Sequence, residues 1–217
     1  MQERRRSNRE AARPPLSPVV GLLLAAGSAR RFGRQKLLEP LATEGCVAAL
    51  ACRKLVQATD RVIAVVRPES LELADLLARE GAEVTTCAES YRGMGVTLAH
   101  AISVARDAAG WLVALADMPF IRLSTLTALT EALRLGESLV MPSYRGRRGH
   151  PVGFGVSHCD QLLQLDGDEG GRSILQKYGE QCRVIQVQDP GIVLDIDEEK
   201  DLARGLQLLS AGITDES

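Results

Sequence analysis

The stretch LLLAAGSARRFGRQKLL at residues 22–38 decides how the chain folds and where its chemistry lies. Its apolar first half has the composition of a strand buried on both faces of a parallel sheet. The loop that follows contains two glycines and several cationic side chains, among them those of Arg30, Arg31 and Lys36. Glycine allows the backbone to approach a ligand closely, and cations in such a loop attract phosphate groups. The stretch therefore predicts a phosphate-binding loop after the first strand.

Two common phosphate-loop patterns do not fit this stretch. The dinucleotide pattern needs G-x-G-x-x-G, and the triphosphate pattern needs G-x-x-x-x-G-K followed by serine or threonine. Here five residues separate Gly27 from Gly33, and Leu37 follows Lys36. The spacing instead resembles L-A-[AG]-G-x-S-x-R-[FM]-G-x-x-K, which is typical of nucleotidyltransferases. The alternative is a sheet strand followed by a solvated basic loop.

Composition favours one α/β domain of ordinary charge. The chain has 217 residues, 45% of them hydrophobic and only 3% aromatic, so its core must be aliphatic. A net charge of −2 favours neither nucleic acid nor membrane as a partner. Five scattered cysteines without C-x-x-C spacing are typical of a reduced compartment, and we expect a cytoplasmic protein. We expect residues 1–18 to form a disordered basic tail and residues 19–210 to form one domain.

After the first strand the pattern alternates between apolar runs and amphipathic segments. The predicted strands lie at residues 62–66, 83–87, 111–116, 138–141, 182–187 and 192–196, and the predicted helices at 70–79, 96–108, 124–135 and 198–209. Such alternation predicts a three-layer α/β/α sandwich with a mostly parallel, Rossmann-like sheet. Ligands of these sheets lie at the carboxyl ends of the strands.

Acidic residues follow two of the predicted strands. Asp117 ends the apolar run of LADMPF, and Asp195 and Asp197 lie in VLDIDEEKDL. Carboxylates in such places suit Mg²⁺, which prefers oxygen ligands and bridges to phosphates. Asp117 could instead form a turn, and Asp197 could begin a helix. We favour Asp197 over Asp195 as the second metal ligand.

Other polar residues are candidates for substrate contacts. Gly95 and Thr97 begin a predicted helix, whose amides suit an anion or a base edge, although a plain helix cap is the alternative. His150 in GHPVGF could contact the acceptor phosphate or be a hydrogen-bonded strand residue. Arg172 could reach an anionic acceptor from a glycine-rich turn. The arginines within residues 145–148 could form a phosphate patch or a solvated loop.

Six motifs in order give a family resemblance: LAAGSARRFGRQKLL, GMG at Gly93, LADMPF, RGHPVGF, GDEGGR and LDIDEEKDL. With these the chain resembles the molybdenum cofactor nucleotidyltransferases, and within them the CTP-using cytidylyltransferases. The resemblance implies the nucleotide-diphospho-sugar transferase fold. It also implies transfer of CMP from CTP to molybdopterin-bound molybdenum with release of pyrophosphate. A molybdenum-dependent oxidoreductase would be the client.

The resemblance also implies roles for individual residues. Lys36 and Arg31 would stabilise the departing phosphates, and Mg²⁺ would be held by Asp117 and Asp197. His150 and Arg172 would bind the acceptor. The residues that would bind the nucleotide are Leu24, Ala25, Ala26, Gly27, Ser28, Arg30, Gly95 and Thr97.

The chain departs from the family pattern at residues 198–199, where Glu-Glu replaces the usual Thr-Pro, and in the segment after Lys36. Two alternatives therefore stay open. One is a guanylyl- or cytidylyltransferase for another phosphate acceptor. The other is a non-catalytic carrier that delivers the cofactor to an apo-oxidoreductase.

Overall fold

The computed structural model describes residues 18–27, 36–41 and 45–212. The predicted basic tail lies outside this part of the chain, apart from residue 18. Three predicted site residues also lie outside it: Ser28, Arg30 and Arg31.

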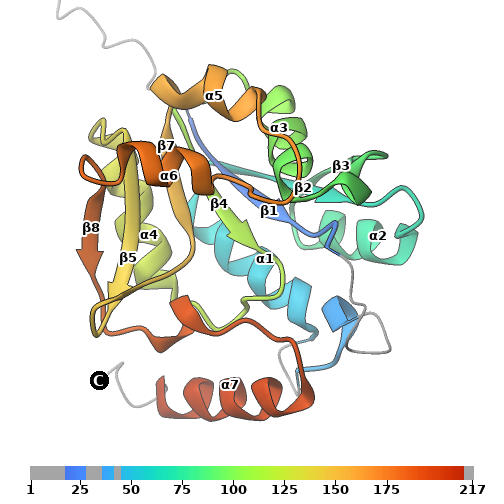
Figure 1. Ribbon diagram of the computed structural model, residues 1–217. Helices are drawn as coiled ribbons and strands as arrows, with labels where there is room; N and C mark the ends of the chain where they lie inside the picture. Colours follow the sequence, from blue (N-terminus) through green and yellow to red (C-terminus); the bar gives the residue numbers. More distant parts are fainter. Residues whose placement is uncertain (1–17, 28–35, 42–44, 213–217) are drawn as a thin grey trace, which may run out of the picture.

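An eight-stranded sheet forms the centre of the molecule, in the order β3-β2-β1-β4-β7-β5-β6, with β8 pairing with β5 (Figure 1). The strands are β1 (Val19–Leu24), β2 (Arg61–Val66), β3 (Glu83–Thr86), β4 (Gly110–Leu115), β5 (Leu139–Tyr144), β6 (Arg147–Arg148), β7 (Val152–Gly155) and β8 (Arg183–Gln186). Only β6 and β7 among these run against the others. The mostly parallel sheet that the alternating pattern predicts is confirmed.

Helices cover both faces of the sheet. One face carries α1 (Val47–Ala58), α2 (Leu71–Arg79) and α4 (Leu123–Arg134), and the other carries α3 (Met94–Val104), α5 (Cys159–Leu163) and α6 (Arg172–Tyr178). The last helix, α7 (Glu199–Gly212), lies at the bottom of Figure 1 and packs through Leu202 and Leu206 against the core cluster of the first face. Short 3₁₀ turns are η1 (Lys36–Leu38), η3 (Ser90–Arg92), η4 (Val156–His158) and η5 (Pro190–Val193). The three-layer fold class is confirmed.

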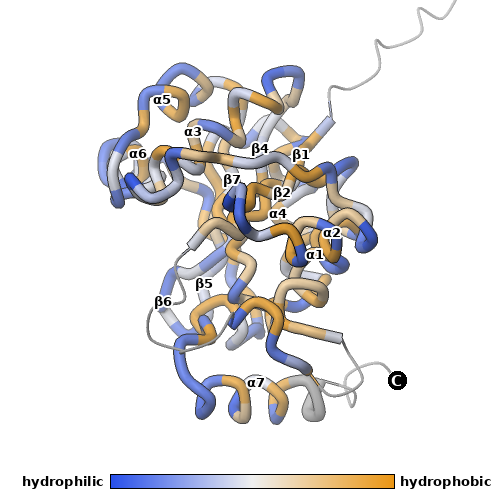
Figure 2. Tube along the Cα trace, turned by 90° about the vertical axis from the view of Figure 1, so that its right-hand side faces the viewer, coloured by the Kyte–Doolittle hydropathy of each residue, from blue (hydrophilic) through white to orange (hydrophobic). Residues whose placement is uncertain are grey.

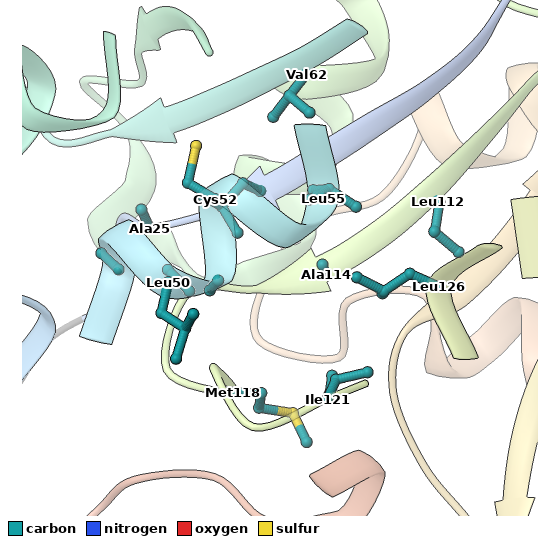
Figure 3. Packing of buried hydrophobic residues seen from close by; sticks show 14 of the residues in the cluster. Ala25, Leu50, Cys52, Leu55, Val62, Leu112, Ala114, Met118, Ile121 and Leu126 are labelled. Carbon is teal, nitrogen blue, oxygen red and sulfur yellow. The ribbon is translucent and has the colours of Figure 1, made fainter. Parts of the chain in front are cut away.

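The alternation of side chains along β1 divides the core in two. Val19 and Leu23 pack with the layer of α1, α2 and α4, whereas Leu22 packs with the layer of α3. Figure 3 shows the first of these clusters, in which Leu55 of α1 packs close to Ala114 of β4. Apolar residues follow the strands in Figure 2, and α7 alternates between apolar and polar positions. Two buried clusters therefore hold β1 rigidly where it leads into the predicted phosphate loop.

The strand predicted at residues 192–196 is wrong. Pro190 and Gly191 begin the 3₁₀ turn η5 instead, and the side chain of Asp189 accepts a hydrogen bond from the amide of Gly191. The fixed φ of Pro190 and the hydrogen bond from Gly191 to Asp189 favour this tight turn over an extended strand. Helix α1 was not predicted, although its apolar residues lie on its buried side.

The described helices include none that is both long enough and apolar enough to cross a membrane.

Candidate functional site

One lysine brings together two carboxylates that are far apart in the sequence. Nζ of Lys36, at the start of η1, donates hydrogen bonds to Oδ2 of Asp117 at 2.8 Å and to Oδ1 of Asp197 at 3.0 Å. Asp117 follows β4, and Asp197 immediately precedes the first turn of α7. The Lys36 side chain is 13% exposed, whereas that of Asp197 is 45% exposed, so the cluster opens to solvent on the Asp197 side. We call these three residues the Lys36 cluster.

Backbone contacts hold the two acidic segments beside each other. The amide of Ile196 donates to the carbonyl oxygen of Asp117 at 3.0 Å. The side chain of Asp201 accepts from the amides of Asp197 at 3.1 Å and Glu198 at 2.8 Å. An acidic side chain in the first turn that reaches back to preceding amides caps a helix start. The cap therefore fixes the backbone of Asp197.

The buried carboxylate of Asp189 connects the start of α4 with η5. Asp189 is 1% exposed and accepts from the amide of Arg122 at 2.8 Å, the hydroxyl of Thr125 at 2.7 Å and the amide of Gly191 at 2.9 Å. These bonds join the start of α4 to η5. Three donors compensate a buried carboxylate, whose removal would leave them without an acceptor.

Lys54 of α1 braces the loop after Asp117. Its Nζ donates to the carbonyl oxygens of Pro119 at 2.8 Å and Ile121 at 2.9 Å. Neither Lys54 nor Asp189 was a predicted site residue. Asp189 could have been found, because an acidic residue directly before a proline is typical of a helix start. Nothing local distinguishes Lys54 from other lysines, since its partners are 65 and 67 residues away.

The electrostatics of the cluster keep Lys36 charged. Burial acts to lower the pKa of Lys36, but the charges and hydrogen bonds of Asp117 and Asp197 outweigh it and raise the pKa above its ordinary value. An ammonium that faces two carboxylates leaves the cluster with excess negative charge. The cluster can therefore accept a further cation.

His150 lies close to the same acids but is held neutral. Burial lowers its pKa, and the charges of Asp117 and Asp195 oppose this only in part. Its amide donates to the carbonyl oxygen of Ile192 at 2.9 Å. Its Nδ1 atom is buried and has no hydrogen-bond partner among the described residues. A neutral ring with an unused nitrogen beside the cluster is suited to a hydrogen bond with a ligand.

The donor set fits a divalent cation. Two carboxylates approach one point, which is the oxygen-rich arrangement that Mg²⁺ accepts, with waters and phosphate oxygens as its remaining ligands. The described residues contain no group of three or more histidine, cysteine, aspartate or glutamate side chains that could hold a metal by themselves. Any metal here would therefore depend on a bound phosphate for part of its coordination.

The predicted nucleotide residues at the end of β1 form its transition to the loop. Leu24, Ala25 and Ala26 are buried and Gly27 is exposed. Arg67, after β2, donates from Nε to the carbonyl oxygen of Ala26 at 2.8 Å. The strand β1 ends at Leu24, and the described part of this segment ends at Gly27. Residues 28–35 lie outside the described part.

Gly95 and Thr97 have partners within the protein. The amide of Gly95 donates to the carbonyl oxygen of Gly167 at 2.7 Å, and the hydroxyl of Thr97 donates to the carbonyl oxygen of Gly93 at 3.2 Å. Gly93 has φ of +131°, and a Cβ there would overlap the carbonyl oxygen of Gly167. The GMG motif thus has a structural use, which is to dock α3 onto the loop before α6.

The predicted acceptor residues separate in the structure. His150 lies beside the Lys36 cluster, as described above. Arg172 begins α6 with an exposed side chain, and its amide donates to the carbonyl oxygen of Glu169 at 3.1 Å. The structure records no contact between Arg172 and the cluster. Asp195 is exposed, whereas Asp197 is the residue that Lys36 contacts.

A three-layer α/β/α sandwich that carries a lysine and two carboxylates at one end of its strands has the arrangement of a nucleotidyltransferase. Residues 21–182 match the family described as MobA-like NTP transferase domain. This match covers most of the chain, and the chain therefore belongs to that family.

Individual proteins show the same relationship. The purine catabolism protein PucB of Bacillus subtilis is 30% identical over 199 residues, which cover 86% of this chain and 96% of PucB. Rv0371c of Mycobacterium tuberculosis superposes with a TM-score of 0.77 at 25% identity and covers 88% of this chain and 98% of its own. A second structure of Rv0371c, in complex with manganese, has a TM-score of 0.73 at 23% identity over 88% and 98% of the two chains. The nucleotidyl transferase Mth528 of Methanothermobacter thermautotroptrophicus has the same fold, with a TM-score of 0.75, 20% identity and coverage of 89% and 99%.

Proposed function

We propose that the protein transfers CMP from CTP to molybdopterin-bound molybdenum and releases pyrophosphate. The observation that carries the proposal is the convergence of Asp117 and Asp197 on Lys36. The family supports nucleotidyl transfer in general. The choice of CTP and of a molybdopterin acceptor rests on the sequence resemblance, in particular on Ala26 and on the GHP and DID motifs.

The reaction is an attack by an acceptor phosphate oxygen on the α-phosphorus of the nucleotide. A new P–O bond forms at the α-phosphorus, the bond to the β-phosphate oxygen breaks, and pyrophosphate leaves with that electron pair. The attacking oxygen is already ionised, so no general base is needed. Two polyanions must be brought together, and positioning and charge compensation are therefore the main tasks of the protein.

The residues of the site suit these tasks. Asp117 and Asp197 would hold Mg²⁺, which when bound supplies charge compensation for the reacting phosphates. Lys36 remains protonated and would bind phosphate oxygens as a point charge, together with Arg31 and Arg30. His150 would orient the acceptor by a hydrogen bond from its neutral ring. Manganese in the relative Rv0371c supports a divalent cation as the cofactor.

Release of pyrophosphate from each nucleotide tests the proposal. The full chain is incubated with Mg²⁺, molybdopterin-bound molybdenum and either CTP, GTP or ATP, and chelator is added to a matched sample. We expect release from CTP only, and none with chelator. Release from GTP alone would indicate a guanylyltransferase. Activity with another phosphorylated acceptor but not with molybdopterin would contradict the acceptor. No release with any nucleotide would favour the carrier.

A further inference from the structure

A cavity of about 190 Å³ lies between the β5–β6 hairpin and α7. Its charged lining comes from Arg145 and Arg147 of the hairpin and Arg204 of α7. Tyr144 and Leu208 contribute apolar surface to its walls. Figures 1 and 2 both show β5 above α7, which is the region of this cavity. We call it the arginine cavity.

The three arginines of the arginine cavity lack a carboxylate partner among the described residues. None of them forms an ion pair in the part of the chain that the structure describes. Five other described arginines, by contrast, each form an ion pair with a carboxylate at 3.0 Å or less. These are Arg53, Arg61, Arg92, Arg134 and Arg183. Three like charges around one cavity repel one another in the absence of an anion, so an anion bound there would gain from all three.

The backbone presents one of these arginines in an unusual way. Arg145 and Gly146 form the two-residue turn between β5 and β6, with φ of +49° and +79°. Such a turn favours asparagine, aspartate or glycine at both positions, and a long side chain with positive φ is uncommon. The Arg145 guanidinium lies 5.1 Å from the centre of the Tyr144 ring, which holds it in place without neutralising its charge.

Two segments of the chain run from the arginine cavity towards the residues around the Lys36 cluster. Leu194 lines the cavity and directly precedes Asp195. Beyond β6 the chain continues through Gly149 to His150, whose amide is bonded to the carbonyl oxygen of Ile192. These two segments connect the cavity with the Lys36 cluster along the chain.

We propose that the arginine cavity binds a ligand with a flat apolar body and a phosphate or carboxylate group. Tyr144 and Leu208 would contact the body, and the arginines would bind the anionic group. This chemistry is available in two sources, which are the part of the acceptor that does not react and a separate small ligand. Assignment to the acceptor rests on the proposed function, whereas the binding itself does not.

Direct binding of model compounds tests the cavity. Titration calorimetry on the full chain would use 1-naphthyl phosphate, with 1-naphthol and inorganic phosphate as probes that each lack one half of the ligand. We expect binding of 1-naphthyl phosphate, and at least tenfold weaker binding of the other two. Arg147→Ala and Arg204→Ala should each weaken it about tenfold, in line with the loss of one charge-assisted hydrogen bond.

Controls separate this site from the Lys36 cluster and from general loss of charge. Arg106→Ala removes an exposed arginine that also forms no ion pair with a described residue, and it should leave the affinity unchanged. Lys36→Met should likewise leave it unchanged. Arg145→Gly removes a charge while relieving the positive φ, so its loss of binding cannot be ascribed to unfolding. Absence of binding, or binding that depends on Lys36 and not on the arginines, overturns the proposal.

The transfer assay then identifies the source of the ligand. If the acceptor is the ligand, Arg147→Ala and Arg204→Ala raise its KM about tenfold and leave the KM of CTP unchanged. If the ligand is separate, the acceptor KM stays constant although naphthyl phosphate binding is lost. An enzyme that is inactive with every nucleotide contradicts the proposed function but leaves the calorimetric result intact.

Discussion

The amide of Ile196 donates a hydrogen bond of 3.0 Å to the carbonyl oxygen of Asp117. This single bond connects the residue that ends the buried part of the sheet with the segment that enters the last helix. Asp197 follows Ile196 directly, so the bond determines how far apart the two carboxylates can lie. Both then contact the same lysine nitrogen.

Neutralising either acid of the Lys36 cluster should remove activity. We expect Asp117→Asn and Asp197→Asn to lower kcat/KM by about 10²–10³-fold, which is the range for loss of one preorganised electrostatic contact. Asp195→Asn is the matched control, since Asp195 is exposed and two residues from Asp197. Steady-state pyrophosphate release measures all three. A larger effect from Asp195→Asn than from Asp197→Asn would assign the ligand role to Asp195.

Removing the lysine should have opposite effects on metal binding and on turnover. Lys36→Met eliminates a cation that lies 2.8 Å and 3.0 Å from the two carboxylates, so Mn²⁺ should bind the nucleotide-free protein about tenfold more tightly. Turnover should fall because the phosphates lose their point charge. Electron paramagnetic resonance of free Mn²⁺ measures the affinity. Weaker Mn²⁺ binding in this variant would show that Lys36 does not compete with the metal.

Asp189 should be important for the stability of the protein. In Asp189→Asn, one of the oxygens that accept from Arg122, Thr125 and Gly191 becomes an amide donor. We expect a loss of about 2–3 kcal/mol in the free energy of unfolding, as for hydrogen bonds to a buried charge. Urea denaturation measures this loss. Asp107→Asn, at an exposed ion pair with Arg61, should change it by less than about 1 kcal/mol.

The helix cap at Asp201 predicts a smaller and more specific effect. Asp201→Ala leaves the amides of Asp197 and Glu198 without their acceptor, at a cost of about 1 kcal/mol. Because the cap fixes the backbone of Asp197, the Mg²⁺ concentration for half-maximal activity should rise as well. Asp201→Asn keeps one acceptor oxygen. Its stability and its Mg²⁺ requirement should therefore lie between those of the natural protein and those of Asp201→Ala. An unchanged Mg²⁺ requirement would separate the cap from the function of Asp197.

The lowered pKa of His150 predicts that the protein loses stability at acidic pH. Its pKa is lowered in the folded protein, so the unfolded chain binds a proton more readily. Its stabilising contribution is therefore complete above the ordinary histidine pKa of about 6.5 and is lost as the pH falls through the lower, folded value. His150→Gln should show a smaller drop in Tm between pH 7 and pH 5 than the natural protein. Equal drops would mean that other groups cause the acid sensitivity.

Much of the fold could be predicted from local patterns. The apolar runs of β1, β2 and β4 are short and bounded by polar turns, and each one appears in the sheet near its expected place. The rule that parallel strands present their carboxyl ends together was sufficient to predict that Asp117 lies on the same side of the sheet as the loop after β1. The details of pairing were less accessible. The antiparallel insertion of β7 between β4 and β5 depends on contacts between residues about 40 apart, which no local pattern encodes.

The candidate site, like the fold, could be predicted only in part. The residue types of Lys36, Asp117 and Asp197 were recognised from motifs, but the contact of the lysine with both acids was not expected. Lys54 and Asp189 were missed because their partners lie in distant segments. The nucleotide-binding role of Gly95 stays a prediction, and the hydrogen bond from its amide to Gly167 was not expected because Gly167 is distant in sequence.

The distance in sequence between Lys36 and Asp197 has a consequence for how the protein is made. A ribosome releases the first four strands of the sheet long before it reaches the residue that completes the cluster. A growing or prematurely terminated chain can thus acquire a partial sheet, but it lacks one of the two acids. The complete Lys36 cluster can therefore form only after residue 197 has left the ribosome.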